Sequence, residues 1–354
     1  MKLLLSTLAL AVSLAASLHT PAAAQSDILL RLRSGSPLGD RFRVDSASGF
    51  VAKGVLGIGI IPFTGAGERM MWHPYKAAFR AGSIGSAGTQ WDDPNVGFYT
   101  WAGGYNTIAL GLSSFAMGYQ STALGSYSTA LGYTANADGT GAVALGYRTT
   151  ANADYSVAIG QRASTSGRAG AIVFSDGSTT DSTRASANNQ FTVRAAGGTR
   201  LFTNATMTTG VQLSAGGSSW SVISDRNRKE AFLGIDGEDV LTRIRSLPVT
   251  TWRYIDEEDR TVRHIGPMAQ DWHRAFGFTS DATTINMSDF DGVNLAAIQA
   301  LEARTTGQAA RIETLEAEND ALRARVGERD RAVESLEARV ARLEALMADA
   351  AARP

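Results

Sequence analysis

Residues 121–133 read Ser121-Thr122-Ala123-Leu124-Gly125-Ser126-Tyr127-Ser128-Thr129-Ala130-Leu131-Gly132-Tyr133, and in this stretch one seven-residue unit follows another. The period continues on both sides, because glycine occupies nine of the ten positions spaced by seven from Gly104 to Gly167, with Ala153 as the exception. A glycine in every heptad would cost a helix about 1 kcal/mol each relative to alanine. The period therefore predicts short strands separated by turns, stacked as a β-solenoid in which each unit is buried by its neighbours.

Alternation within each unit assigns the side chains to two faces of a strand. In Thr129-Ala130-Leu131, the alanine points to one face, and the threonine and the leucine point to the other. We expect the large residues to fill the interior of the roll. The alanines would then face a partner chain, because a face of small residues lets another surface approach closely.

A second period of seven lies in the C-terminal region, where it indicates a helix instead of strands. Counting from Ile298, most a and d positions are apolar, and the register never slips. The a positions are Ile298, Thr305, Ile312, Asn319, Val326, Val333, Val340 and Met347, and the d positions are Leu301, Gln308, Leu315, Leu322, Arg329, Leu336 and Leu343. This pattern predicts a coiled coil, with an amphipathic helix packed on its own domain as the alternative. β-Branched a residues with leucine at d favour two strands, so the heptads alone leave dimer and trimer open.

The first 24 residues have the three regions of a secretory signal peptide. Lys2 precedes an apolar run, Leu3 to Leu18, and small residues, Pro21-Ala22-Ala23-Ala24, follow it. We therefore expect an exported protein that is extracellular, on the cell surface or in the periplasm. No later segment has the length and apolar character of a membrane-spanning helix, so none is expected after the signal peptide is removed.

The composition of the 354 residues excludes several kinds of chemistry. There is no cysteine, which excludes thiol catalysis and disulfides. The four histidines are scattered without the spacing of a metal site, and we expect neither a metal nor a cofactor. A formal net charge of -1 with mixed signs offers no basic surface for nucleic acid.

The segment Ser224-Asp225-Arg226-Asn227-Arg228-Lys229 places a potential nucleophile five residues before a scarce lysine. Of 33 basic residues only Lys2, Lys53, Lys76 and Lys229 are lysine. Arginine keeps its proton in proteins, whereas a lysine can lose it when burial and neighbouring cations favour the neutral amine. The pair therefore suggests a serine nucleophile with a lysine base. The alternative is that Ser224 caps a helix and Lys229 is merely solvated.

The repeat strings quoted above resemble the head repeats of YadA-like trimeric adhesins. In that family two units form one coil of a left-handed parallel β-roll, and three chains pack together. The resemblance implies a homotrimer, and on this ground we favour three helices over two for the coiled coil.

A second resemblance covers the region after Ile223. Ser224-Asp225 with Lys229, then Leu247-Pro248-Val249, Ile265-Gly266-Pro267-Met268-Ala269-Gln270 and Asp291-Gly292-Val293, follow one another in the order of the C-terminal intramolecular chaperone, or auto-processing, domain of phage tailspikes and endosialidases. The local patterns predict a helix, a strand, a helix opening near Pro267 and a final helix. The resemblance implies a trimeric domain that templates folding of the preceding fibre and then cuts itself off. By matching position, Ser224 is the nucleophile, Lys229 the general base and Ile223-Ser224 the scissile bond.

The expected fold is mainly β with a C-terminal α region: a trimeric left-handed parallel β-roll head and a β stalk, then a small α+β chaperone domain and a coiled coil. The expected segments are a signal peptide (1–24), an N-terminal β region (25–100), head repeats (101–170), a β neck (171–222), the chaperone domain (223–300) and the coiled coil (296–350).

The expected function is that of an exported homotrimeric fibre, resembling an adhesin, whose C-terminal domain leaves by a single self-cleavage and has no multi-turnover activity. Its partners would be its own copies and a cell-surface or extracellular ligand. The alternative is a structural or adhesive fibre that retains its C-terminal domain. A hydrolase of an external polymer would need paired carboxylates. We expect Asp92-Asp93 and Glu257-Glu258-Asp259 to lie in turns or loops instead, and His264, Gln270 and Asp271 to be structural.

Overall fold

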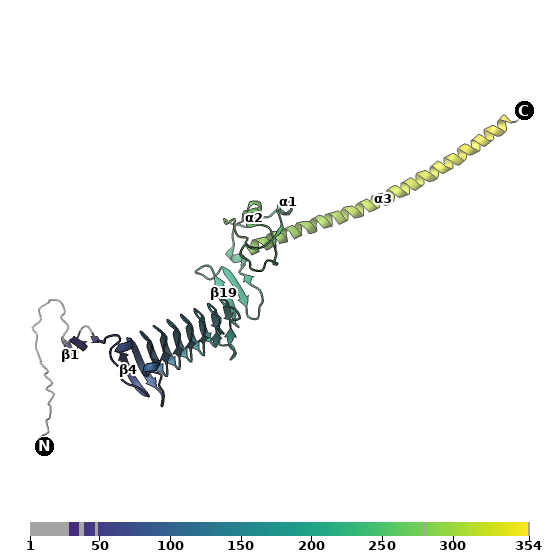
Figure 1. Cartoon of the computed structure of the whole chain (residues 1–354). Helices are drawn as coiled ribbons and strands as arrows, with labels where there is room; N and C mark the ends of the chain where they lie inside the picture. Colours follow the sequence, from purple (N-terminus) through teal and green to yellow (C-terminus); the bar gives the residue numbers. More distant parts are fainter. Residues whose placement is uncertain (1–27, 35–38, 47–48, 279, 353–354) are drawn as a thin grey trace, which may run out of the picture. The chain divides into compact units, whose positions relative to one another are not determined.

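The structure is a computed structural model that describes residues 28–34, 39–46, 49–278 and 280–352 (Figure 1). The predicted signal peptide, residues 1–24, lies outside the described residues. Contacts divide the chain into two units. The first runs to Leu201 and includes Gln212–Ser221, and the second comprises Phe202–Val211 and everything from Val222 onward.

The first unit is built on a β-solenoid of about five turns at residues 101–175, in which two sheets run side by side. Each coil contributes a long strand to one sheet and a two-residue strand to the other (Figure 1). The long strands are β4 (Gly67–His73), β5 (Ala78–Ile84), β6 (Trp101–Tyr105), β8 (Phe115–Tyr119), β10 (Thr129–Tyr133), β12 (Val143–Tyr147), β14 (Val157–Gln161), β16 (Ile172–Ser175) and β18 (Phe191–Arg194). The short strands are β7 (Ile108–Ala109), β9 (Thr122–Ala123), β11 (Asn136–Ala137), β13 (Thr150–Ala151), β15 (Ala163–Ser164) and β17 (Thr183–Arg184).

Parallel pairing is in register from coil to coil, so that equivalent residues of the repeat stack on each other. The long-strand sheet begins before the repeats, where β4 pairs antiparallel with β5, and continues after them through β16 and β18 into the expected neck. Three further strands, β1 (Ile28–Ser34), β2 (Gly39–Asp45) and β3 (Gly49–Ala52), form a separate antiparallel sheet. The last β element before the second resemblance is the sheet of β19 (Gly198–Phe202), β20 (Gly210–Ser214) and β21 (Ser221–Val222).

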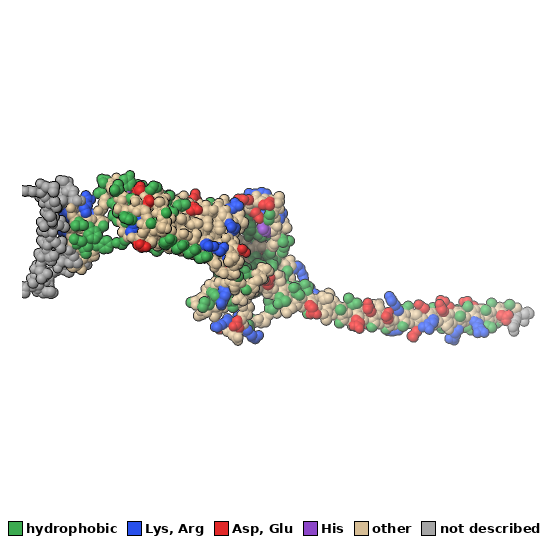
Figure 2. Space-filling view, turned by 90° about the horizontal axis from the view of Figure 1, so that it is seen from below, with side chains coloured by type: hydrophobic (Ala, Val, Ile, Leu, Met, Phe, Trp, Pro, Cys, Tyr) green, Lys and Arg blue, Asp and Glu red, His purple; other side chains and the backbone are tan. Residues whose placement is uncertain are grey.

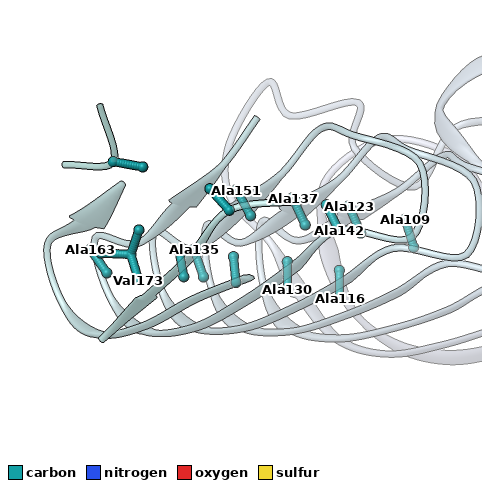
Figure 3. Close-up of a cluster of buried hydrophobic side chains, with 14 of the residues drawn as sticks. Ala109, Ala116, Ala123, Ala130, Ala135, Ala137, Ala142, Ala151, Ala163 and Val173 are labelled. Atoms are coloured by element: carbon teal, nitrogen blue, oxygen red, sulfur yellow. The ribbon is translucent and has the colours of Figure 1, made fainter. Parts of the chain in front are cut away.

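The interior of the solenoid is filled by alanine, and the prediction that large residues fill it is wrong. Ala130 and its equivalents in the other coils are completely buried (Figure 3), together with inward-facing serines and threonines. The large residues point outward, where Met117 and Leu124 keep 40% and 44% of their surface exposed. The alternation of small and large residues along a strand is compatible with either face pointing inward. The choice is made by the narrow space within a coil, which is filled by alanine, serine and threonine side chains and, near its end, by Val173, and which leaves no room for leucine or phenylalanine.

The glycine grid is explained by the close stacking of the coils. At Gly132 the backbone has φ +130°, and a Cβ atom would lie 2.0 Å from the carbonyl oxygen of Gly146 in the next coil. Ala153 interrupts the grid where the stacking is looser: Val143 pairs with Val157 fourteen residues on, but Val157 pairs with Ile172 fifteen residues on. At that corner the Asn152 N–H donates a hydrogen bond to a side-chain oxygen, Thr165 Oγ1, at 3.2 Å. The equivalent N–H groups of the preceding coils donate to backbone carbonyl oxygens instead.

The buried alanines provide a direct test of which face is inside. We expect Ala151→Leu to lower the free energy of unfolding by about 1–3 kcal/mol or more, because overpacking forces the backbone apart. Thr150→Leu, at the adjacent outward position of β13, is the matched control and should cost much less. Urea unfolding followed by circular dichroism measures both. A larger loss in the Thr150 variant would restore the original assignment of the faces.

The second unit packs two short helices on the start of a long one. The elements are α1 (Gly237–Ser246), β22 (Thr250–Trp252), β23 (His264–Gly266), α2 (Ala269–Phe276) and α3 (Met287–Ala351). Their order is the predicted one, except that β23, which pairs with β22, is an additional strand. Their core consists of Val240, Leu241, Trp272, Val293, Ala296 and Ala297. Asp236 and Asn286 cap α1 and α3, each accepting hydrogen bonds from backbone N–H groups of the first turn.

Beyond this core, α3 continues as one uninterrupted helix to Ala351 (Figure 1). The apolar a and d residues of the predicted heptads, from Ile312 to Leu343, are all exposed. Within the described part of the chain, no helix has the length and apolar character needed to cross a membrane.

Candidate functional site

The predicted serine and lysine are in direct contact. Lys229 Nζ donates a hydrogen bond to Ser224 Oγ at 2.6 Å. The contact depends on a single 3₁₀ turn, η3 (Arg226–Arg228), whose N-cap is Asp225: its Oδ1 atom accepts the N–H of Asn227 at 2.9 Å. The turn brings the chain back, so that two side chains five residues apart meet. Ser224 therefore does not cap this helix, as the alternative had it, because Asp225 does.

The residue before Ser224 is held by a neighbouring segment. The Ile223 N–H donates to the carbonyl oxygen of Gly210 at 3.1 Å, extending the contact between β21 and β20 by one residue. This bond fixes the backbone on the acyl side of the predicted scissile bond. Nothing in the local sequence around Ser224 indicates Gly210, since the two residues are brought together only by strand pairing.

Within one chain the site is open to solvent. Ser224 and Lys229 are both exposed, and so are the neighbouring cations Arg226 and Arg228. Arg226 lies over the ring of Phe232 at 5.2 Å from the ring centroid, and Phe232 itself is exposed. Two influences deprotonate a lysine, neighbouring positive charge and burial. In the single chain Arg226 and Arg228 are neighbours of Lys229 in the sequence, and none of the three is buried.

The remaining polar residues considered in the sequence have structural partners. His264 Nε2 lies 3.2 Å from Glu257 Oε1, and its ring packs on Trp252 at 4.8 Å between centroids. Asp271 pairs with Arg274 at 2.9 Å. Gln270 lines a shallow groove together with Trp252, Tyr254, Met268 and other residues, most of which lie in the segments that follow β22 and precede α2 and α3.

The acidic pair of the N-terminal region also serves the fold. Asp92 accepts the N–H of Gly65 at 2.7 Å. Asp93 lies 2.8 Å from the buried His73, and this hydrogen bond, with help from Lys76, lowers the pKa of Asp93. Among the residues that the structure describes, no three His, Asp or Glu side chains come together to hold a metal ion.

Family models match two parts of the chain, and these are the two parts that the sequence singled out. Residues 224–279 match the model described as "Chaperone of endosialidase", of the Peptidase S74 type. Residues 109–135 and 137–163 match two copies of the "YadA head domain repeat". No curated protein and no solved structure matches the chain.

The chain thus joins YadA-type head repeats to an endosialidase-type chaperone domain, and the suspected architecture is confirmed. The chaperone match begins at Ser224 itself, the first residue after the predicted cut. The match to a peptidase family suggests a self-cleaving domain. The catalytic roles of Ser224 and Lys229 remain predictions.

Proposed function

We propose that this protein is an exported homotrimeric fibre, resembling an adhesin, whose C-terminal domain is an intramolecular chaperone released by one self-cleavage at Ile223-Ser224. The observation that carries the proposal is the 2.6 Å hydrogen bond from Lys229 Nζ to Ser224 Oγ at the first residue of the chaperone match. A serine hydroxyl is a poor nucleophile until a base takes its proton, and Lys229 is within reach to do so.

The position of the serine determines how the cut proceeds. Because Ser224 follows the scissile bond, its Oγ reaches the Ile223 carbonyl carbon through a five-membered ring. Lys229 takes the hydroxyl proton, the Oγ–C bond forms, the C–N bond breaks, and the proton passes to the Ser224 amine. The resulting ester is hydrolysed by water to an Ile223 carboxylate and a free Ser224 hydroxyl, which leaves a fibre ending at Ile223 and a released piece that begins at Ser224.

Trimerisation is supported by two apolar surfaces that the single chain leaves uncovered. The outward face of the long-strand sheet carries rows of apolar residues, among them Phe115, Met117 and Leu145, and Figure 2 shows hydrophobic side chains along the visible side of the solenoid. The heptad seam of α3 is the second surface. Extended apolar surfaces of this kind mark sites of association. The first surface lies on the repeats that resemble a trimeric head, and the second follows directly on the domain that resembles a trimeric chaperone.

We further propose that assembly controls the cut. Lys229 is exposed in the single chain, so the burial that favours its neutral form must come from partner chains. Cleavage would then report a correctly closed trimer.

Removing the coiled coil tests this control. A chain that ends at Arg304 keeps the buried Ala296 and Ala297 and the ion pair of Arg304 with Glu238, so the chaperone core remains complete. Although the apolar face of the solenoid remains, we expect loss of the coiled coil to leave this chain largely monomeric by light scattering. It should then cleave at least tenfold more slowly than the full chain, measured by gel densitometry over time.

Fusing an unrelated trimeric coiled coil after Arg304 is the matched control and should restore the rate. Cleavage of the monomeric truncation at the full-length rate would contradict the proposed control by assembly. The second candidate function, a fibre that keeps its C-terminal domain, is distinguished by the experiment on Ser224 described below.

A further inference from the structure

Equivalent turn positions form a row along the solenoid, and every second position of this row is a tyrosine. The row occupies the turn before each long strand and consists of Tyr99, Ser113, Tyr127, Gly141 and Tyr155. All five have the same left-handed backbone, with φ between 54° and 64°. Each N–H donates to a carbonyl oxygen of the preceding turn at 2.7–2.9 Å. The side chains therefore leave rigid, equivalent positions in the same direction.

Large and small residues alternate along this row for a steric reason. The ring of Tyr155 extends over the preceding coil, since a Cβ atom placed on Gly141 would lie 3.1 and 3.4 Å from two of its ring carbons. A side chain at Gly141 would therefore press against the ring of Tyr155 in its present position. Tyr99, Tyr127 and Tyr155 are thus spaced two coils apart, with 52%, 62% and 70% of their surface exposed.

A second set of tyrosines shows why this row is different. Tyr105, Tyr119, Tyr133 and Tyr147 occur in four successive coils and stack on one another, with ring centroids 4.9–5.1 Å apart and planes within 15°. The two inner rings, Tyr119 and Tyr133, are stacked on both faces, and each is 39% exposed. Among the described residues, no other ring stacks on Tyr127 or Tyr155, and Tyr99 contacts only the tilted ring of Phe98, at 6.3 Å between centroids. All three rings of the alternating row therefore keep at least half of their surface exposed.

The spacing of these free faces identifies a class of ligand. Neighbouring strands lie about 4.8 Å apart, so rings two coils apart are separated by about 10 Å. In an extended β-1,4-linked polysaccharide every second sugar presents the same face, and the disaccharide has this same length. The apolar C–H face of a sugar packs on an aromatic ring, and a tyrosine held on a rigid scaffold loses little conformational entropy on binding. Ser126, Thr140 and Asp154, one position before Tyr127, Gly141 and Tyr155, place polar groups beside the rings.

We propose that Tyr99, Tyr127 and Tyr155 form a binding surface for an extended β-1,4-linked polysaccharide. The inference rests on the adhesive part of the proposed function and names the ligand class of the head. It is independent of self-cleavage, because all three tyrosines lie in the first unit.

Calorimetric titration of the full chain with cellohexaose and chitohexaose tests this surface, since a hexasaccharide contains three disaccharides for three rings. We expect binding of at least one of the two and weaker binding of maltohexaose, whose α-1,4 linkages curve the chain. Tyr127→Ala should weaken binding at least tenfold, because it removes the middle ring. Tyr133→Ala, in the stacked ladder, is the matched control and should leave binding unchanged.

Several outcomes would overturn the inference: no binding of either β-linked hexasaccharide, equal binding of maltohexaose, or an equal loss in both tyrosine variants. Light scattering and mass spectrometry of the same samples report assembly and cleavage. A chain that assembles and cleaves but binds no β-1,4-linked sugar refutes this inference alone. If Tyr127→Ala dissociates the assembly, the row is a contact between chains and the inference is also overturned.

Discussion

Replacing Ser224 by alanine is expected to leave the chain uncut, so that mass spectrometry finds one species extending through residue 354 where the unchanged protein yields two pieces. The substitution removes the only hydroxyl that can form the five-membered ring with the Ile223 carbonyl, so the loss should be complete. Lys229→Arg should also block the cut, because arginine keeps a positive charge but cannot act as a base.

Asp225→Asn is the matched control for the serine variant. An asparagine oxygen can still cap the turn that brings Lys229 to Ser224, so this variant should still cleave. One uncut species of about 37.3 kDa, less any removed signal peptide, in both the unchanged and the Ser224→Ala protein would favour the alternative fibre that retains its C-terminal domain.

Gly132→Ala is expected to disrupt the solenoid. Its backbone angle of φ +130° is one that residues with a Cβ atom rarely adopt, and such strain costs on the order of 1–3 kcal/mol. The added Cβ would also lie 2.0 Å from a backbone oxygen of the next coil, and neither backbone can yield without breaking the ladder. We expect a loss of at least about 3 kcal/mol in the free energy of unfolding, measured by urea titration of the uncleaved Ser224→Ala chain.

Gly167→Ala provides the comparison for this loss. Gly167 has a left-handed φ of +75°, but no atom lies within 4 Å of the added Cβ. Only the backbone preference is lost, and the cost should be about 1–2 kcal/mol. Similar losses at both positions would mean that close stacking of the coils is not what the glycine grid protects.

Much of the fold could be predicted because the repeat is local. A glycine every seven residues excludes a helix, and the same unit stacked on itself leaves few arrangements other than a solenoid. The assignment of its faces failed, because an alternating strand has two possible orientations. The volume available inside a coil decides between them, and that volume depends on how the two sheets are spaced.

The candidate site could likewise be predicted only in part. Ser224 and Lys229 could be paired from their spacing, since one turn of chain is enough to bring them together. The hydrogen bond from Ile223 to Gly210 could not, because thirteen residues and a strand pairing separate the two. The tyrosines of the head recur every 28 residues in one row and every 14 residues in the other, yet the sequence does not say which rings have free faces.

The sequence by itself determined the period of the solenoid, the order of elements in the chaperone domain and the identity of the serine–lysine pair. These follow from interactions between residues close along the chain or from a unit repeated in register. Only the tertiary structure decided that alanine fills the coils, that Gly210 holds the residue before the predicted cut, and that one row of tyrosines is open while the other is stacked. Each of those depends on the space between backbones that are distant in sequence, and that space is defined only when the coils and strands have packed.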